Sequence, residues 1–250
     1  MTSATASPDP TALIVGERVK ICAVRDADFA TWASWFNSAH ITSFLDHGEF
    51  PNSESDQRQF FATARANGRF IGMVRSIATD RLLGVISLSE INRAKRSAQL
   101  ALVVPIRCET APLAALEAVA LVTEHALTRM GLMRLWAGQA HPGTARWAKR
   151  MELIGWISEG VARHAFVHGD TTSDAVWTSA LKSDVERLRL RRNGSLWCGT
   201  ERMQKMLRYR EFAEARPAVE LVAEAVRAVG DERWRLLERV EEKCSGEPGL

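Results

Sequence analysis

The pattern of hydrophobic and polar positions in the first part of the chain predicts one strand followed by two helices. Apolar residues alternate with others over residues 17–24, as expected of a half-buried strand. Aromatic residues then recur at helical spacing over residues 29–36, and Asp26 stands where the N-cap of that helix belongs. Ser53 opens a second predicted helix, which ends at Gly68. The aromatic stripe is expected to belong to the core.

The middle of the chain predicts three strands and a long helix. Residues 69–78 and 82–92 form two strand candidates joined by a short turn. The next candidate, residues 98–106, is almost wholly apolar, which is typical of a central strand buried on both faces. Apolar residues then recur at three- and four-residue steps over residues 111–130, and Gly131 follows where a helix C-cap is expected.

The last part of the predicted domain contains a strand over residues 132–140, a short helix over residues 144–154 and two further strands, 157–169 and 174–181. The full order is strand, two helices, three strands, helix, strand, helix, two strands. This order predicts a mixed α/β fold, with helices on both faces of one sheet.

The chain divides into three predicted parts. Residues 1–12 are small, polar and interrupted by proline, and are expected to be a disordered leader rather than a signal peptide. Residues 13–184 contain the α/β domain, and residues 185–250 form a helical extension without strand patterns. Pro217 marks the start of the second helix of the extension, and Asp231 after Gly230 marks the third.

The extension is expected to pack against the domain or against a second copy of the chain, as a homodimer. Its apolar residues recur at helical spacing, which predicts helices with one apolar face. These residues are Leu221, Ala225, Val229, Trp234, Leu237 and Val240.

Composition and charge indicate which partners, metals and compartment to expect for this protein. The formal net charge of +3 does not call for nucleic acid or an anionic membrane as partner. Residues 187–210 hold seven arginines and one lysine against a single acid, a run that a solvated helix face explains better than a polyanion site does. No apolar run approaches the ~20 residues of a membrane span. The four cysteines and the other potential ligands show no metal-ligand spacing, so we expect no metal and a cytoplasmic protein with reduced thiols.

Four segments, taken in order, resemble one enzyme family. They are GERVKICAVRDADF (16–29), RLLGVISLSEIN (81–92), EAVALVTEHALTRMGLMRLWAG (117–138) and MELIGWISEGVAR (151–163). Over residues 13–182 the chain resembles the GNAT acetyltransferases, particularly the branch of ribosomal-protein N-terminal and nucleotide-sugar N-acetyltransferases. The resemblance implies a mostly antiparallel sheet in which two neighbouring parallel strands splay apart, and acetyl-CoA as co-substrate in the gap between them.

The resemblance also implies which residues contact acetyl-CoA. The main chain of the first splayed strand would pair with the pantetheine arm, and the pyrophosphate would rest on the loop and first turn of the next helix, where N–H groups favour negative charge. The residues so placed are Leu102, Val103, Val104, Arg107, Thr110, Ala111, Leu113, Ala114 and Thr144.

The loop before that helix departs from the family pattern. The family has Arg/Gln-x-x-Gly-x-Gly/Ala, whereas this chain reads RCETAPLAAL over residues 107–116, without a glycine. Glycine lets the backbone approach a phosphate without a Cβ in the way. Two interpretations follow: a variant loop that still binds through the Thr110 hydroxyl and small alanines, or a cofactor site that has decayed.

The acid and the base of the reaction are also open. The family's tyrosine position carries Met151, and the only tyrosine, Tyr209, lies in the extension, so a water is expected to serve as the acid. For the base there are two candidates, Glu90 at the end of a central strand and His141 just after the second splayed strand. Each has a structural alternative, a strand-end carboxylate or a loop histidine, and His125 is expected to be a core residue.

The acceptor pocket is expected to involve Trp35, Phe44, Asp46 and Asn92, each of which also has a structural explanation. The first hypothesis is acetyl transfer to a primary amine of a small molecule, such as an amino sugar or a nucleotide-linked amino sugar. The alternatives are a protein N-terminal or side-chain acetyltransferase, and a GNAT-shaped binding module without turnover.

Overall fold

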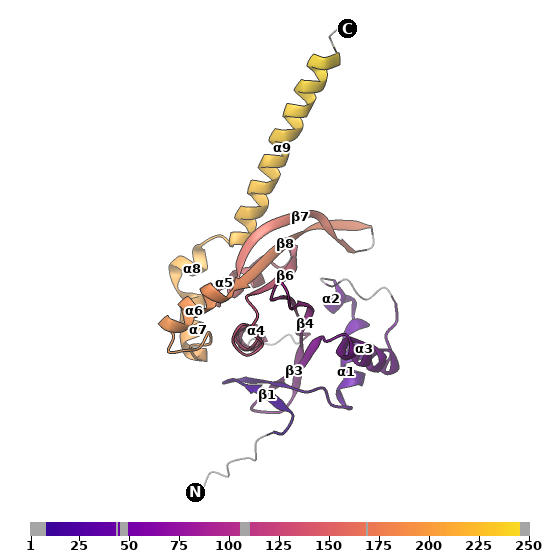
Figure 1. The fold of residues 1–250 in the computed structure, drawn as a ribbon, viewed down its shortest axis with the longest axis vertical. Coiled ribbons are helices and arrows are strands. Elements are labelled where there is room, and N and C mark those ends of the chain that lie inside the picture. Colours follow the sequence, from indigo (N-terminus) through magenta and orange to yellow (C-terminus); the bar gives the residue numbers. More distant parts are fainter. Residues whose placement is uncertain (1–8, 44, 46–49, 106–110, 169, 246–250) are drawn as a thin grey trace.

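The computed structural model describes residues 9–43, 45, 50–105, 111–168 and 170–245. The described residues form one eight-stranded sheet with the strand order β1-β2-β3-β4-β5-β6-β8-β7 (Figure 1). Its strands are β1 (Ala12–Val15), β2 (Val19–Cys22), β3 (Phe70–Ser76), β4 (Leu82–Asn92), β5 (Ser97–Val103), β6 (Arg134–His141), β7 (Ile157–His168) and β8 (Thr171–Leu181). All neighbouring strands pair antiparallel except β5 and β6, which are parallel.

Helices cover both faces of the sheet, as the sequence predicts. Those within the domain are α1 (Asp28–Phe36), α2 (Ala39–Thr42), α3 (Glu54–Ala66), α4 (Ala111–Thr128) and α5 (Ala145–Glu152). Alternate residues of a strand point to opposite faces, and on β4 Ile86 packs in the core cluster with α4, whereas its neighbour Val85 packs with α1. The mixed α/β architecture is therefore confirmed, with α4 on one face and α1 and α3 on the other.

Three details of the N-terminal region differ from the sequence predictions. The strand β1 and the short helix α2 were not predicted. The N-cap of α1 is Ala27, which makes no side-chain cap, so the prediction that Asp26 caps this helix is wrong. The Asp26 carboxylate instead accepts a hydrogen bond from Arg58 on α3, at 2.7 Å. The predicted cap of α3 is confirmed, because Ser53 forms a reciprocal capping box there.

After β8 the chain is helical, through α6 (Lys182–Arg191), α7 (Thr200–Arg208), α8 (Arg210–Glu214) and α9 (Ala218–Ser245). The predicted break at Gly230 and Asp231 is wrong, because α9 runs through both residues as one helix of 28 residues. A mid-helix glycine costs about 1 kcal/mol, which a helix of this length absorbs.

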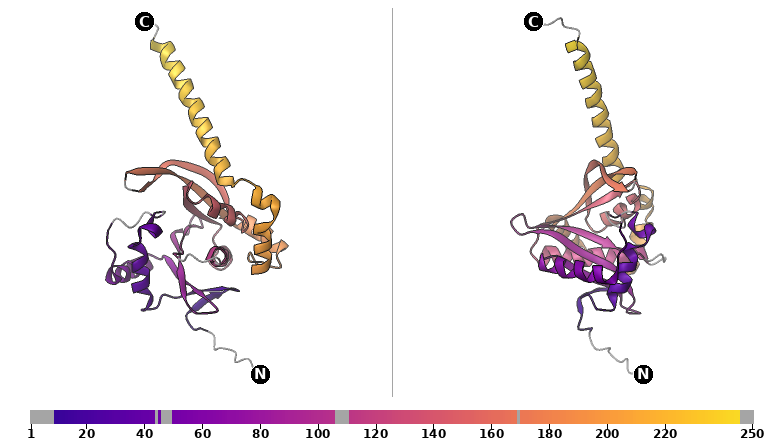
Figure 2. Two further views of the ribbon diagram at one scale, coloured as in Figure 1. Left: turned by 180° about the vertical axis from the view of Figure 1, so that it is seen from behind. Right: turned by 90° about the vertical axis from the view of Figure 1, so that its right-hand side faces the viewer.

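The start of α9 packs against the domain, and the rest projects away from it (Figures 1 and 2). Val219 and Ala223 are buried, and the backbone N–H of Ala218 donates to the Glu152 carboxylate of α5, at 3.0 Å. Further along, Trp234 and Leu237 are exposed. Packing of the extension against the domain is therefore confirmed, and its pairing with a second copy stays a prediction. In the described part of the chain no helix is long and apolar enough to span a membrane.

Candidate active site

The two parallel strands of the sheet separate after their first residues. Both strands are fully described, and their pairing covers only Ser97 with Arg134, Ala98 with Leu135, and Gln99 with Trp136. Beyond Gln99, β5 continues along β4 as far as Val103, and β6 continues along β8 as far as His141. The strands therefore form a fork, closed at Gln99 and open toward Val103 and His141. The predicted splay is confirmed.

The open end of the fork offers main-chain groups to a ligand. From Leu100 to Val103, β5 pairs with β4 along one edge, while the edge toward β6 has no strand partner among the described residues. Buried N–H and C=O groups require partners, and an extended ligand with amide groups can supply them. Leu102, Val103 and Val104 are half-buried there, where the family resemblance implies the pantetheine arm.

The helix that follows β5 presents its first turn beside this open end. Its first backbone N–H groups have no partner within the helix and carry positive charge from the helix dipole. Leu113 and Ala114 are 7% exposed and belong to the core cluster. Any contact of these two residues with a pyrophosphate is therefore through the main chain. The residues present thus fit acetyl-CoA, whose thioester supplies the activated acetyl group when bound.

Several predicted residues are not among those whose placement is described. Arg107, Thr110, Phe44 and Asp46 lie outside the described residues, and of Ala111 only the backbone position at the start of α4 is described.

Other predicted residues are placed, each with contacts inside the fold, and their roles in binding stay predictions. Trp35 is buried with Phe29 and Trp32 in the core between α1 and the sheet. Asn92 is exposed, and its side-chain oxygen accepts from the Lys95 backbone N–H in the turn after β4, at 2.8 Å. Thr144 occupies the N-cap of α5, and its hydroxyl donates to the Ala140 carbonyl at 2.6 Å.

Glu90 lies near the closed end of the fork, in an irregularity of β4. The pairing of β4 with β5 shifts between Ser89 and Asn92, and Glu90 has φ = 50°, which is uncommon for a residue with a side chain. Bulges of this kind re-aim side chains and occur next to active sites. Ser89 pairs with Gln99, the last β5 residue that pairs with β6. Glu90 is thus one residue away from the point where the strands separate, and its side chain is exposed.

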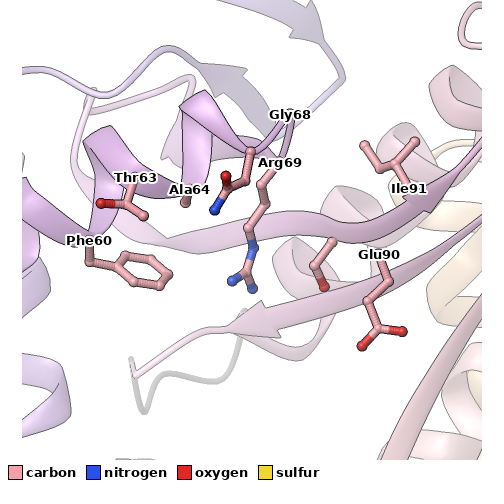
Figure 3. Close-up of a pocket in the computed structure, with 9 residues that line it drawn as sticks. Phe60, Thr63, Ala64, Gly68, Arg69, Glu90 and Ile91 are labelled. Carbon is pink, nitrogen blue, oxygen red and sulfur yellow. The ribbon is translucent and has the colours of Figure 1, made fainter.

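A hollow of about 270 Å³ beside Glu90 is formed by the C-terminal half of α3 and the end of β4. Figure 3 shows Phe60 on one side of Arg69, and Glu90 and Ile91 on the other. The Arg69 guanidinium donates to the Ser87 hydroxyl at 3.1 Å and lies 5.5 Å from the centre of the Phe60 ring. Partial burial lowers the pKa of Arg69.

His141, the second candidate base, lies at the other end of the fork. It is the last residue of β6, it is 7% exposed, and it precedes a cis bond to Pro142. Its Nδ1 atom is buried and has no hydrogen-bond partner among the described residues. His141 comes five residues after Trp136, which corresponds to about 16 Å along the strand. Glu90 and His141 therefore cannot both act on one reacting atom.

Two tryptophans beside the fork were not predicted as site residues. Trp136 alternates with the core residue Leu135 and so points to the opposite face, where its ring meets that of Trp177 at 5.0 Å between centroids. Together with Lys95, Ser97 and Arg134 they line a hollow of about 430 Å³. Period-two alternation along residues 134–138 could have indicated the face of Trp136, but its meeting with Trp177 depends on β8.

Arg134, at the start of β6, is fixed by an acid on β7. Its guanidinium forms two hydrogen bonds with the Glu159 carboxylate, which also accepts from the Ser179 hydroxyl at 2.6 Å. The bonds from Arg134 hold the pKa of Glu159 below its usual value.

The position expected to hold an acid carries a buried thioether. Met151 is 2% exposed, and its sulfur accepts from the Gln139 side chain at 3.4 Å. A thioether has no proton to donate. Tyr209 lies in the turn between α7 and α8, and it is exposed. Among the described residues, no three His, Cys, Asp or Glu side chains lie close enough together to hold a metal ion.

Comparison with known proteins identifies the class to which this geometry belongs. Residues 18–156, more than half of the chain, match the family described as the acetyltransferase (GNAT) domain. The chain therefore belongs to the GNAT acetyltransferase family, and it is an acyl-CoA-dependent N-acetyltransferase with acetyl-CoA as its co-substrate. No curated protein sequence matches the chain.

Solved structures share the fold at low sequence identity. RimJ from Mycobacterium smegmatis, in complex with CoA-disulfide, superposes with a TM-score of 0.60 at 16% identity, over 72% of this chain and 91% of that one. Spermidine N-acetyltransferase from Vibrio cholerae, in complex with CoA and spermine, gives 0.58 at 18% identity, over 68% and 99%. A GNAT-family acetyltransferase from Bacillus anthracis gives 0.57 at 20% identity, over 68% and 98%. These similarities support the fold and leave the branch within the family open.

Proposed function

We propose that this protein transfers the acetyl group of acetyl-CoA to a primary amine of a small molecule. The observation that carries the proposal is the fork between β5 and β6, which pair over three positions and then separate. A thioester lying in the fork with its pyrophosphate toward the start of α4 would have its acetyl group near the closed end. Glu90, Gln99 and Trp136 surround that end.

Glu90 is the base in this proposal. The amine reaches the enzyme as an ammonium ion and must lose a proton before its nitrogen attacks the thioester carbonyl. A carboxylate acting through a water can take that proton, and Glu90 forms no ion pair within the described residues that would compete. The C–N bond then forms, the nitrogen loses its second proton to water, the C–S bond breaks, and the CoA thiolate takes a proton from water.

The surroundings of the fork favour an acceptor with a ring and negative charge. Trp136 and Trp177 provide aromatic faces, and Lys95 provides a positive charge in the same hollow, where the charge of Arg134 is paired with Glu159. A nucleotide-linked amino sugar has both a ring and a negative charge, whereas a polyamine would meet a charge of its own sign at Lys95. The nucleotide-sugar branch of the family is therefore our proposal over the polyamine acceptor named for the Vibrio cholerae enzyme.

The first test is the effect of acetyl-CoA on thermal unfolding of the full chain. A ligand at a hundred times its Kd adds about 2.7 kcal/mol to stability, so a clear rise in Tm is expected despite the glycine-free loop. The second test incubates the protein with acetyl-CoA and a panel of amines and follows acetylation by mass spectrometry. The panel contains amino sugars, nucleotide-linked amino sugars, spermidine and peptides with free N-termini.

Each result separates the competing functions. Acetylation of nucleotide-linked amino sugars ahead of the other amines is the expected outcome. Preferred acetylation of spermidine or of peptides would retain the enzyme and replace the acceptor. If the Tm does not rise at millimolar acetyl-CoA, the chain is the binding module without turnover, and the proposed function is wrong.

A further inference from the structure

A second hollow adjoins the one beside Glu90, with which it shares Gly68, Arg69 and Ile91, and it is lined by arginines. It has a volume of about 750 Å³ and lies where the loops after α3, β4 and α4 meet. The arginines that line it are Arg65, Arg69, Arg93, Arg96 and Arg129. None of the described residues that line it is acidic.

These five guanidinium groups are not neutralised within the described part of the chain, where none of them forms an ion pair with a carboxylate. Arg96 uses its Nε to donate to the Gly131 carbonyl at 2.8 Å, which leaves its other N–H groups available. The buried Nε of Arg69 has no hydrogen-bond partner among the described residues. The positive field reaches the nearby His125, whose pKa is lowered by burial and by the charge of Arg129.

Helix ends explain only part of this cluster. Arg65 is in the last turn of α3 and Arg129 follows the last residue of α4, where cations interact favourably with the helix dipole. Arg93 and Arg96 lie in the turn between two strands, which has no comparable dipole. Five like charges around one concave surface repel one another unless an anion lies between them.

We infer that this hollow binds an organic polyphosphate, such as a nucleoside polyphosphate. The planar guanidinium group recognises phosphate oxygens in pairs, and five such groups suit more than one phosphate. Phe70, Ile91 and Leu132 form an apolar part of the same surface, which suits the organic part of the ligand.

The proposed ligand site is distinct from the acetyl-CoA site. Acetyl-CoA is expected to place its pyrophosphate at the start of α4, whereas Arg129 follows the end of that helix. A helix of 18 residues spans about 27 Å. The inference therefore does not depend on the proposed acceptor or on turnover.

The concave shape favours a small ligand over a nucleic acid. The arginines gather around one hollow instead of forming a stripe along the surface, and a stripe is what a nucleic-acid backbone requires.

The test is titration calorimetry of the full chain with ATP and with inorganic triphosphate, in the presence of saturating CoA. We expect ATP to bind with one site per chain, and inorganic triphosphate to bind more weakly because it lacks an organic part. The double variant R93Q/R129Q removes two charges from exposed side chains and should weaken ATP binding by about tenfold or more. The matched control, R187Q/R191Q, removes two exposed charges from α6 and should change the Kd by less than about twofold.

Any of three results would overturn the inference. The first is that ATP does not bind at about 1 mM with CoA present, and the second is that the two double variants change the Kd for ATP equally. The third is that the chain binds a single-stranded RNA oligonucleotide and does not bind ATP. A Tm within a few degrees of the parent for R93Q/R129Q would show that the variant is folded, and acetyl-CoA binding would report on the other site independently.

Discussion

The two ends of the fork between β5 and β6 differ in the groups they present. At the open end, the described residues of β5 and α4 that are expected to meet the cofactor are apolar, as Leu102 and Leu113 are, so main-chain groups are what they can offer. At the closed end, charged and aromatic side chains gather, among them Glu90, Arg134 and Trp136. Binding through the main chain tolerates side-chain changes that leave the backbone in place, whereas chemistry and acceptor recognition through side chains do not. The two ends of the fork are therefore expected to respond differently to substitution.

The largest expected effect comes from filling the fork itself. Ala101 is exposed on β5, two residues beyond the last pair with β6. In Ala101→Trp the indole would occupy the space between the separating strands, so we expect a fall in kcat/KM of more than about 100-fold and loss of the Tm rise with acetyl-CoA. The value of kcat/KM is measured with the acceptor that the amine panel identifies, and the Tm is measured with acetyl-CoA alone.

The control for this variant is Ala94→Trp, which places the same side chain on the exposed turn between β4 and β5. It should keep the acetyl-CoA effect and the activity. A tryptophan at position 101 that leaves both unchanged would show that the cofactor does not lie in the fork.

The next effect compares the two candidate bases. Glu90→Gln removes a carboxylate at the closed end, and a general base contributes about 10²–10⁴-fold. We expect kcat/KM to fall by about 100-fold. His141→Gln, at the open end, should cost less than about threefold. The measurement is kcat/KM for both variants, with Tm as the check on folding.

A larger loss in His141→Gln than in Glu90→Gln would reverse the assignment and move the reacting atoms toward the open end. Unchanged acetyl-CoA binding in both variants is also expected, since neither side chain is needed to hold the main-chain groups of β5.

The sequence predicts the sheet well because the strands carry their own signal. Alternation and apolar runs over residues 69–106 place β3, β4 and β5 close to their observed bounds. The errors come from signals that have more than one physical outcome. Asp26 is a good cap residue but pairs with Arg58, from 32 positions away. Gly230 is a good helix terminator, yet its neighbours favour a continuous helix.

The site is less predictable, because its side chains come from distant parts of the chain. The resemblance to a family indicates the main-chain part, since that part needs only two consecutive elements. Trp136 meets Trp177 because β8 lies between β6 and β7 in the sheet, and no local pattern contains that order. Arg69, Arg93 and Arg129 converge for the same reason, from three separate loops.

The smallest expected effect concerns the ion pair at the closed end, between Arg134 and Glu159. Both side chains are about one third exposed, so solvent screens the pair, and Glu159→Gln should lower the free energy of unfolding at pH 7 by less than about 1 kcal/mol. Because the pKa of Glu159 is lower in the folded protein than its usual value, the pair stabilises the fold above the usual pKa of a glutamate. This contribution is lost as the pH falls through the lowered pKa.

Urea unfolding of the parent and of Glu159→Gln, at pH 7 and at successively lower pH, measures this contribution. The difference in the free energy of unfolding should shrink as the pH falls below about 4. The acetyl-CoA Kd should stay the same, because the pair lies at the closed end and the cofactor contacts are main-chain groups at the open end. A weakened acetyl-CoA Kd in Glu159→Gln at neutral pH would mean that the two ends of the fork are not independent.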